Sequence, residues 1–128
     1  MSDWFSAQAK INANILIGTD LNTSFSSFRK IKSICTDINN ERYGYFKEKG
    51  FEVSIGQSTK VKIPWSMLEK CFAALSSTEG YSGKFFREFY PQQAKDNPCH
   101  VHVVGQIFVV SGLANTENRK YFAKSPVK

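Results

Sequence analysis

The strongest constraint on the fold is a two-residue alternation of apolar side chains near the middle of the chain. It runs through residues 51–55 and resumes at residues 60–63, where valine and isoleucine alternate with lysine. Glycine, glutamine, serine and threonine at 56–59 have the composition of a tight turn. Because successive side chains of a strand point to opposite faces, the pattern predicts a β-hairpin with one apolar and one polar face. An earlier strand at 43–47, turning at Lys49-Gly50, is expected to add a third member to the sheet.

Residues 24–40 repeat apolar side chains at intervals of three and four, which is the spacing of an amphipathic helix. The apolar positions are Phe25, Phe28, Ile31, Cys35 and Ile38. Residues 3–17 show a weaker version of this pattern, and their end, residues 15–18, fits a short strand equally well. We therefore expect a helix before the hairpin, carrying Arg29, Lys30 and Lys32 beside its apolar stripe.

Pro64 ends the hairpin, and Ser66 followed by Glu69 forms a capping box that predicts the start of another helix. This helix is expected to run to about residue 76, with a buried face formed by Leu68, Cys71, Phe72 and Leu75. A shorter helix is predicted at residues 84–90, where Pro91 stops it.

Residues 99–111 are compatible with two structures. Six β-branched residues favour a strand. Asn97-Pro98 at the start, Gly112 at the end and a length of thirteen residues favour a buried helix, which we expect. The chain from residue 115 onwards is polar, and we expect a frayed tail there.

Together these elements predict a single compact α+β domain over residues 1–128, with short helices packed on an antiparallel hairpin or a small three-stranded sheet. The order of helix, hairpin and further helices is also analogous to a winged helix. Three separated cysteines and an N-terminus without a secretory signal indicate a cytoplasmic protein with reduced thiols. No apolar run approaches the roughly 20 residues of a membrane span, so we expect no membrane partner.

The net charge of +6 is distributed unevenly. Residues 25–62 contain eight basic and four acidic side chains, whereas residues 63–98 contain four of each. Helices and hairpins are shapes that fit the major groove of DNA, and tyrosines stack on the bases of single strands. This pattern favours a small basic module that binds nucleic acid through Arg29, Lys30, Lys32, Tyr43, Tyr45, Lys60 and Lys62. The competing explanation is that lysines on an outward hairpin face protect it from aggregation.

Aromatic residues support an alternative function. The chain contains 11 phenylalanines, and large rings gain the most from burial. A surplus of rings around residues 84–90 would form an apolar ligand pocket or the face of a homo-oligomer. Its lining would be Trp65, Phe85, Phe86, Phe89 and Tyr90. If these rings are simply core, the cluster has no role beyond packing.

Catalytic and metal-binding chemistry finds little support in the sequence. His100 and His102 are the only histidines. A strand would place these two side chains on one face, whereas a helix would place Cys99 and His102 on one face, so either structure offers only two ligands from this segment. A zinc site takes three or four ligands. The carboxylates are scattered, and no glycine-rich loop carries the lysine of a phosphate loop. We therefore expect no metal and no cofactor, and we favour a binding protein over an enzyme.

Overall fold

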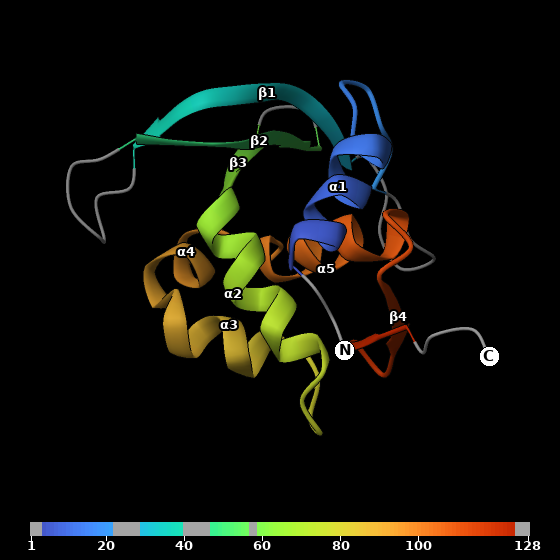
Figure 1. The fold of residues 1–128 in the computed structure, drawn as a ribbon. Helices are drawn as coiled ribbons and strands as arrows, with labels where there is room; N and C mark the ends of the chain where they lie inside the picture. The colour runs from blue at the N-terminus through green and yellow to red at the C-terminus, as the bar shows by residue number, and fades with distance from the viewer. Residues whose placement is uncertain (1–3, 22–28, 40–46, 57–58, 125–128) are drawn as a thin grey trace.

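The computed structural model describes residues 4–21, 29–39, 47–56 and 59–124. A three-stranded antiparallel sheet lies on a layer of helices (Figure 1). Its strands, in the spatial order β1-β2-β3, are β1 Arg29–Asn39, β2 Lys47–Ile55 and β3 Thr59–Pro64. The helices are α1 Trp4–Asn14, α2 Trp65–Leu75, α3 Gly83–Phe89, α4 Pro91–Asp96 and α5 His100–Val110. A second hairpin follows, formed by β4 Ala114–Glu117 and β5 Lys120–Ala123.

These elements confirm the predicted α+β class, with short helices packed on a small three-stranded sheet. The analogy with a winged helix does not hold, because it needs a helix directly before the hairpin, and residues 29–39 form a strand there. None of the helices in the described ranges combines the length and the hydrophobicity that a membrane crossing requires.

β2 and β3 form the predicted hairpin. Phe51 pairs with Ile63 and Val53 with Val61, and all four side chains are buried in the core. The predicted turn at Lys49-Gly50 is wrong, because β2 continues through both residues. A Cβ atom at Gly50 would lie only 2.6 Å from Cδ1 of Ile38. Glycine is therefore needed here for close packing rather than for a turn.

The third strand of the sheet is β1. The helix expected at 24–40 is wrong over residues 29–39, which are extended, and residues 22–28 and 40 lie outside the described ranges. Of the strand expected at 43–47, the structure describes only the last residue, which begins β2.

Bulges in β1 explain why its sequence imitates a helix. The strand pairs with β2 along its length, but the register shifts twice, between Ile31 and Ser33 and between Cys35 and Ile38. Each shift adds a residue to β1 and interrupts the two-residue alternation. The buried residues Ile31 and Ile38 consequently stand seven apart, which is the separation of two helical turns.

α1 and α2 lie where the predicted helices at 3–17 and 66–76 were expected. α1 buries Ala7 and Ile11, and residues 15–18 leave it as a turn rather than as a strand. In α2, Phe72 is only half-buried, with its ring between those of Trp4 and Phe108 at centroid distances of 5.5 and 6.1 Å. The other predicted core positions of α2 are buried, namely Leu68, Cys71 and Leu75.

The start of α2 is not stabilised by the predicted capping box. The helix begins at Trp65, one residue earlier than expected, with Pro64 as its N-cap. Glu48 of β2 instead accepts hydrogen bonds from the backbone N–H and the hydroxyl of Ser66, each at 2.8 Å. Its carboxylate meets the positive end of the helix dipole, so this contact joins the sheet to the helix layer.

Three further helices complete the layer below the sheet. α3 occupies the predicted position but begins and ends one residue earlier than expected, and Pro91 begins α4 directly. α5 confirms the helix expected at 99–111, although it begins at His100 and not at Asn97-Pro98. Gly112 ends it with a φ of 77°, where its N–H donates to the carbonyl of Val109.

The frayed tail expected from residue 115 onwards is wrong over residues 115–123, which belong to the β4–β5 hairpin, and residues 125–128 lie outside the described ranges. Tyr121 of β5 is fully buried, and backbone hydrogen bonds of 2.8 Å pair it in both directions with Tyr81. A Cβ atom at Gly105 of α5 would lie within the ring of Tyr121, so only glycine leaves room for the tyrosine. A deeply inserted side chain thus anchors a segment that is polar elsewhere.

The contact between Glu48 and Ser66 generates a stability prediction. Glu48→Ala removes both hydrogen bonds and the charge at the start of α2, and should lower the free energy of unfolding by about 1–2 kcal/mol. Urea unfolding measures this change. Glu69→Ala is the matched control, because Glu69 is exposed and should cost no more than about 0.5 kcal/mol. A larger loss for Glu69→Ala than for Glu48→Ala would restore the capping box and contradict the structure.

Candidate functional site

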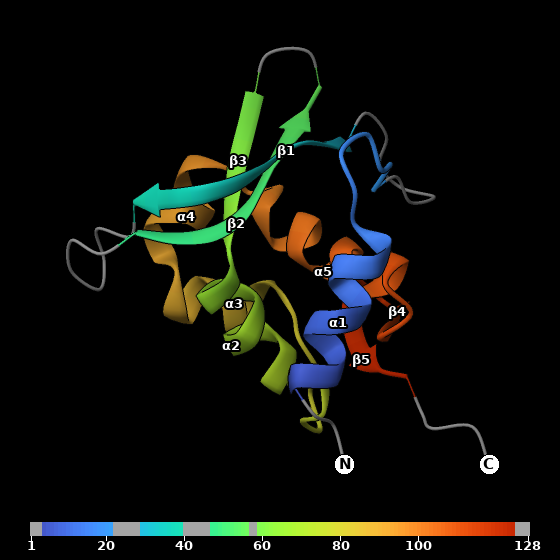
Figure 2. The ribbon, with the colours of Figure 1, turned by 45° about the horizontal axis from the view of Figure 1, so that its top comes forward.

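One face of the three-stranded sheet is turned away from the helices (Figure 2), and exposed lysines lie along its strands. Lys60 and Lys62 of β3 are exposed there, as predicted for the polar face of the hairpin. Lys30 and Lys32 of β1 are exposed on the same face. We call these four residues the lysine face. The prediction had divided them between a helix and a hairpin, whereas the structure brings them together on one sheet.

The sheet register brings Lys32 and Lys60 into contact. Ser54 of β2 pairs with Lys30 on one side and with Lys60 on the other, so the three residues form a row across the sheet. Lys32 follows at the register shift. The nearby Lys60 side chain lowers the pKa of Lys32, because a second ammonium group close by disfavours the charged form. The centre of the lysine face is therefore a pair of like charges.

Glu52 supplies a negative charge on this face. It pairs with Lys62 of β3 and with Ser33 of β1, whose hydroxyl donates a hydrogen bond of 3.3 Å to the Glu52 carboxylate. Its attraction opposes the lowering of the Lys32 pKa but does not reverse it. Positive charge therefore dominates the face.

Lys30 also has a carboxylate neighbour. Its Nζ lies 3.9 Å from Oδ1 of Asp20, and both side chains are more than half exposed. Exposed ion pairs of this kind contribute about 0–1 kcal/mol and are screened by salt. Lys30 therefore remains available to another anion.

Arg29 is the predicted site residue that the structure removes from the face. Its side chain is buried, although its neighbour Lys30 is exposed. Burial, and after it the positive charge of Arg29, lower the pKa of His102 of α5. For Tyr121 of β5, burial raises the pKa to about 12, and the charge of Arg29 opposes this rise. Arg29 thus belongs to an interior polar group. The predicted stacking residues Tyr43 and Tyr45 lie outside the described ranges.

The predicted aromatic cluster separates into three environments. Phe86 and Tyr90 are core residues, with ring centroids 5.2 Å apart. Trp65 packs against Phe51 at the start of α2, with a centroid distance of 5.3 Å. Phe85 and Phe89 are half-buried, as is Trp65, and the two phenylalanines form a ring pair at 4.8 Å.

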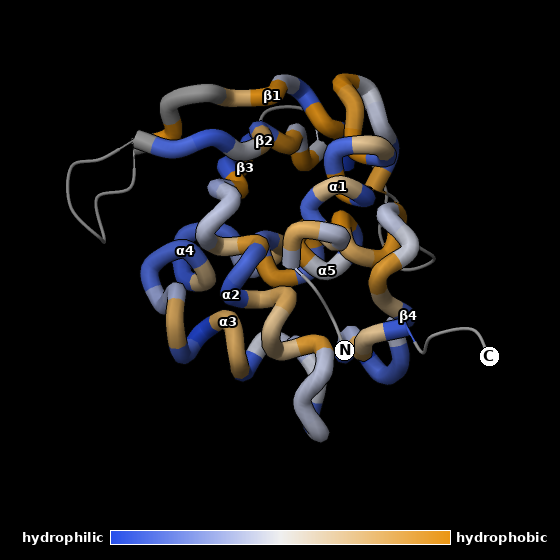
Figure 3. Tube along the Cα trace, viewed as in Figure 1, coloured by the Kyte–Doolittle hydropathy of each residue, from blue (hydrophilic) through white to orange (hydrophobic). Residues whose placement is uncertain are grey.

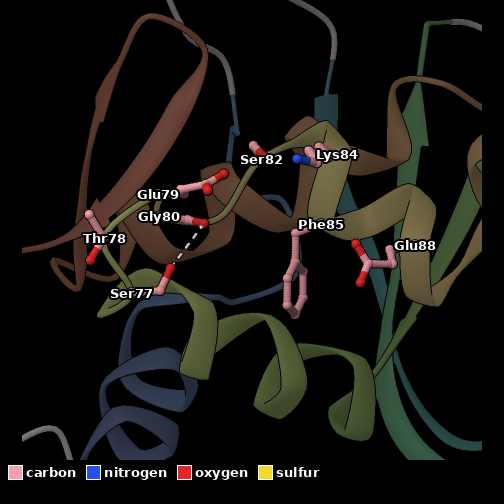
Figure 4. Close-up of a pocket in the computed structure, with 8 residues that line it drawn as sticks. All are labelled: Ser77, Thr78, Glu79, Gly80, Ser82, Lys84, Phe85 and Glu88. Carbon is pink, nitrogen blue, oxygen red and sulfur yellow. Dashed lines mark hydrogen bonds between the residues drawn. The ribbon is translucent and has the colours of Figure 1, made fainter.

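Two surface hollows adjoin Phe85. One, of about 400 Å³, lies between the loop after α2, with residues 77–80, and α3, which contributes Lys84, Phe85 and Glu88 (Figure 4). The second, of about 440 Å³, lies between α2 and α3 and is lined by Ala73, Phe85 and Phe89. Lys70 of α2 places its Nζ 4.2 Å from the centre of the Phe89 ring. Together the hollows form a shallow groove along α3.

Both histidines lie on α5, where His100 is buried and His102 is half-buried. Nδ1 of His102 is 2.9 Å from the hydroxyl of Tyr121. Burial lowers the pKa of His100 to about 4, although a hydrogen bond with the backbone of Lys62 opposes this shift. In the described ranges, no three or more histidine, cysteine and acidic residues are grouped as a metal site would require.

The three cysteines are free. Cys71 is buried in α2 as expected, and burial raises the pKa of its thiol. Cys35 was expected on a helix core face and lies instead half-buried on β1, with its sulfur 3.8 Å from the Ser33 hydroxyl.

Comparisons with protein-family models, with curated proteins and with solved structures find no match for this chain.

The buried His100 predicts a loss of stability in mild acid. Its folded pKa of about 4 lies below the ordinary 6.5, so the unfolded chain takes up a proton first as the pH falls. Its contribution is therefore complete above pH 6.5 and is lost between pH 6.5 and about 4. The expected loss is about 3 kcal/mol.

Urea unfolding at a series of pH values measures this loss, and His100→Gln is the comparison variant. The difference between the two proteins removes the contributions of the carboxylates. An identical pH dependence in the variant would show that His100 is not responsible.

Proposed function

We propose that the protein is a cytoplasmic nucleic-acid-binding module that acts without catalysis, through the lysine face. The observation that carries this proposal is the convergence of four exposed lysines on one face of the sheet, where Lys60 lies close enough to Lys32 to lower its pKa. A phosphate group placed between the two ammonium groups would replace their repulsion with attraction. Because phosphate groups dominate the affinity of nucleic-acid interfaces, a surface of this kind suits a phosphate backbone.

Protection from aggregation explains the lysine face less completely. β3 is an edge strand, and Lys60 and Lys62 on its outer face are a common protective device. Protecting this edge does not require a further lysine from another strand. Lys32 comes from the opposite edge strand and meets Lys60 across β2, which brings an electrostatic cost without further protection. A phosphate ligand bound between the two lysines would offset this repulsion.

The lysine face generates a salt-dependence prediction. If its four lysines meet phosphates, the logarithm of affinity should fall against the logarithm of salt concentration with a slope near −3 to −4. Lys60→Ala with Lys62→Ala should weaken binding to all sequences alike and flatten this slope by about two, because phosphate contacts carry no sequence information. Fluorescence anisotropy at several salt concentrations measures both effects.

The control for this experiment is Lys84→Ala with Lys95→Ala. It removes the same charge from exposed positions on α3 and α4, away from the sheet. If the affinity depends only on net charge, both double variants will weaken binding equally. Equal weakening, or no binding of nucleic acid at low salt, would exclude the lysine face as a specific site.

A second candidate function is supported by the half-exposed pair of Phe85 and Phe89. Their rings border the groove along α3, whose two hollows have the size of small-molecule sites. This supports a role as an aromatic-lined ligand site, or as the contact face of a second copy of the chain.

The groove predicts binding that is insensitive to salt. A small aromatic compound such as indole should raise the melting temperature of the protein, and Phe85→Ala should abolish the increase. Lys60→Ala with Lys62→Ala should leave it unchanged. Analytical ultracentrifugation tests the oligomer, which Phe85→Ala should dissociate. A monomer that no aromatic compound stabilises would exclude both uses of the groove.

A further inference from the structure

The lysine face is wider than a sheet of three strands. Residues 18–21 lie along the free edge of β1 and hydrogen-bond to it, with Leu21 N–H donating to Arg29 at 2.8 Å and Ile31 N–H donating to Thr19 at 2.9 Å. With neighbouring strands about 4.8 Å apart, four such segments span about 14 Å between the outer backbones. The major groove of B-DNA is about 12 Å wide and admits a helix or a two-stranded ribbon. The whole face is therefore too broad to enter it.

A turn of two exposed apolar residues borders this face. The chain leaves α1 at Asn14, and Leu16 and Ile17 follow with side chains 56% and 66% exposed. The turn rises beside the first residues of β1 in Figure 1 and is hydrophobic in Figure 3. We call Leu16 and Ile17 the apolar turn.

The apolar turn is held in place by hydrogen bonds on both sides. The Thr19 hydroxyl accepts a bond of 2.9 Å from the N–H of Leu16, and Gly18 closes the turn with a φ of 91°. The N–H of Gly18 donates to the carbonyl of Ile31 at 2.8 Å. Ile31 lies between Lys30 and Lys32, so the apolar turn adjoins the edge of the strand that carries these two lysines.

We infer that the lysine face binds single-stranded nucleic acid in preference to duplex, with the apolar turn contacting unpaired bases. This inference rests on the proposed function and specifies its ligand. A single strand presents phosphates and the apolar faces of its bases together, whereas a duplex stacks those faces inside. Lys60 and Lys62 are two residues apart on β3, so their Cα atoms lie about 6.7 Å apart, a spacing suited to successive phosphates of an extended strand.

The test compares a fluorescent single strand with the duplex of the same sequence and length, at one salt concentration, by anisotropy. The single strand should bind about tenfold more tightly. Leu16→Ser with Ile17→Ser should lower single-strand affinity by about tenfold and leave duplex affinity within about twofold, because only the apolar contact is lost. The control is Phe5→Ser, which removes an 80% exposed ring at the opposite end of α1 and should change neither affinity.

The outcomes separate this inference from the proposed function. Salt-sensitive binding that depends on Lys60 and Lys62 but shows no preference for single strands overturns the inference alone. No binding of either nucleic acid overturns both. A third arm uses vesicles containing phosphatidylserine. If the Leu16 and Ile17 double variant loses vesicle binding and keeps its single-strand affinity, the apolar turn contacts lipid and the inference is wrong.

Discussion

Burial of one face of the three-stranded sheet decides what the other face presents to solvent. α2 contacts both β2 and β3, and the apolar side chains of the sheet join its core. Because side chains alternate along a strand, each buried residue places its neighbours on the outer side. Lys30-Ile31-Lys32 and Lys60-Val61-Lys62 obey the same rule, since Ile31 and Val61 are buried and the lysines beside them are exposed. A slip of either strand by one residue would bury lysines and expose the core, so core formation and the position of the charges are one constraint.

Local patterns predicted the parts of the molecule whose determinants lie close together in sequence. The alternation at 51–63 and the spacing of Leu68, Cys71 and Leu75 belong to single elements, and both were interpreted correctly. The prediction for β1 failed because the bulges of this strand hide the two-residue alternation, and because its partner strand lies beyond an intervening segment. The cap of α2 and the anchoring of the last hairpin depend on Glu48 and Gly105, which lie far from the elements they stabilise. For the site, the exposed lysines were predicted, but their convergence on one sheet needed the register. The signal available was the repeated pattern of lysine, aliphatic residue and lysine.

Arg29 and Lys30 show how adjacent cations acquire different roles. Arg29 points into the interior, where its charge acts on His102 and Tyr121, while Lys30 lies on the outer face. Burial keeps both histidines neutral at physiological pH, because it lowers the pKa of each. The charge available for recognition therefore comes from lysine ammonium groups and not from the histidines. The pH dependence of stability that His100 contributes originates in the interior, whereas the salt dependence of binding originates at the surface, so these two properties are separable.

The insertion of Tyr121 beside Gly105 has a consequence for the order in which the chain matures. α5 is buried along most of its length, and one wall of its surroundings is the ring of Tyr121. During synthesis the sheet and α1–α5 emerge before that wall exists. Until residue 121 has left the ribosome, α5 has an open apolar side, and chaperones that recognise such surfaces have a defined interval in which to act. The last hairpin therefore closes the core late, and a ribosome stalled before this point would hold a chain that has its helices but lacks its completed interior.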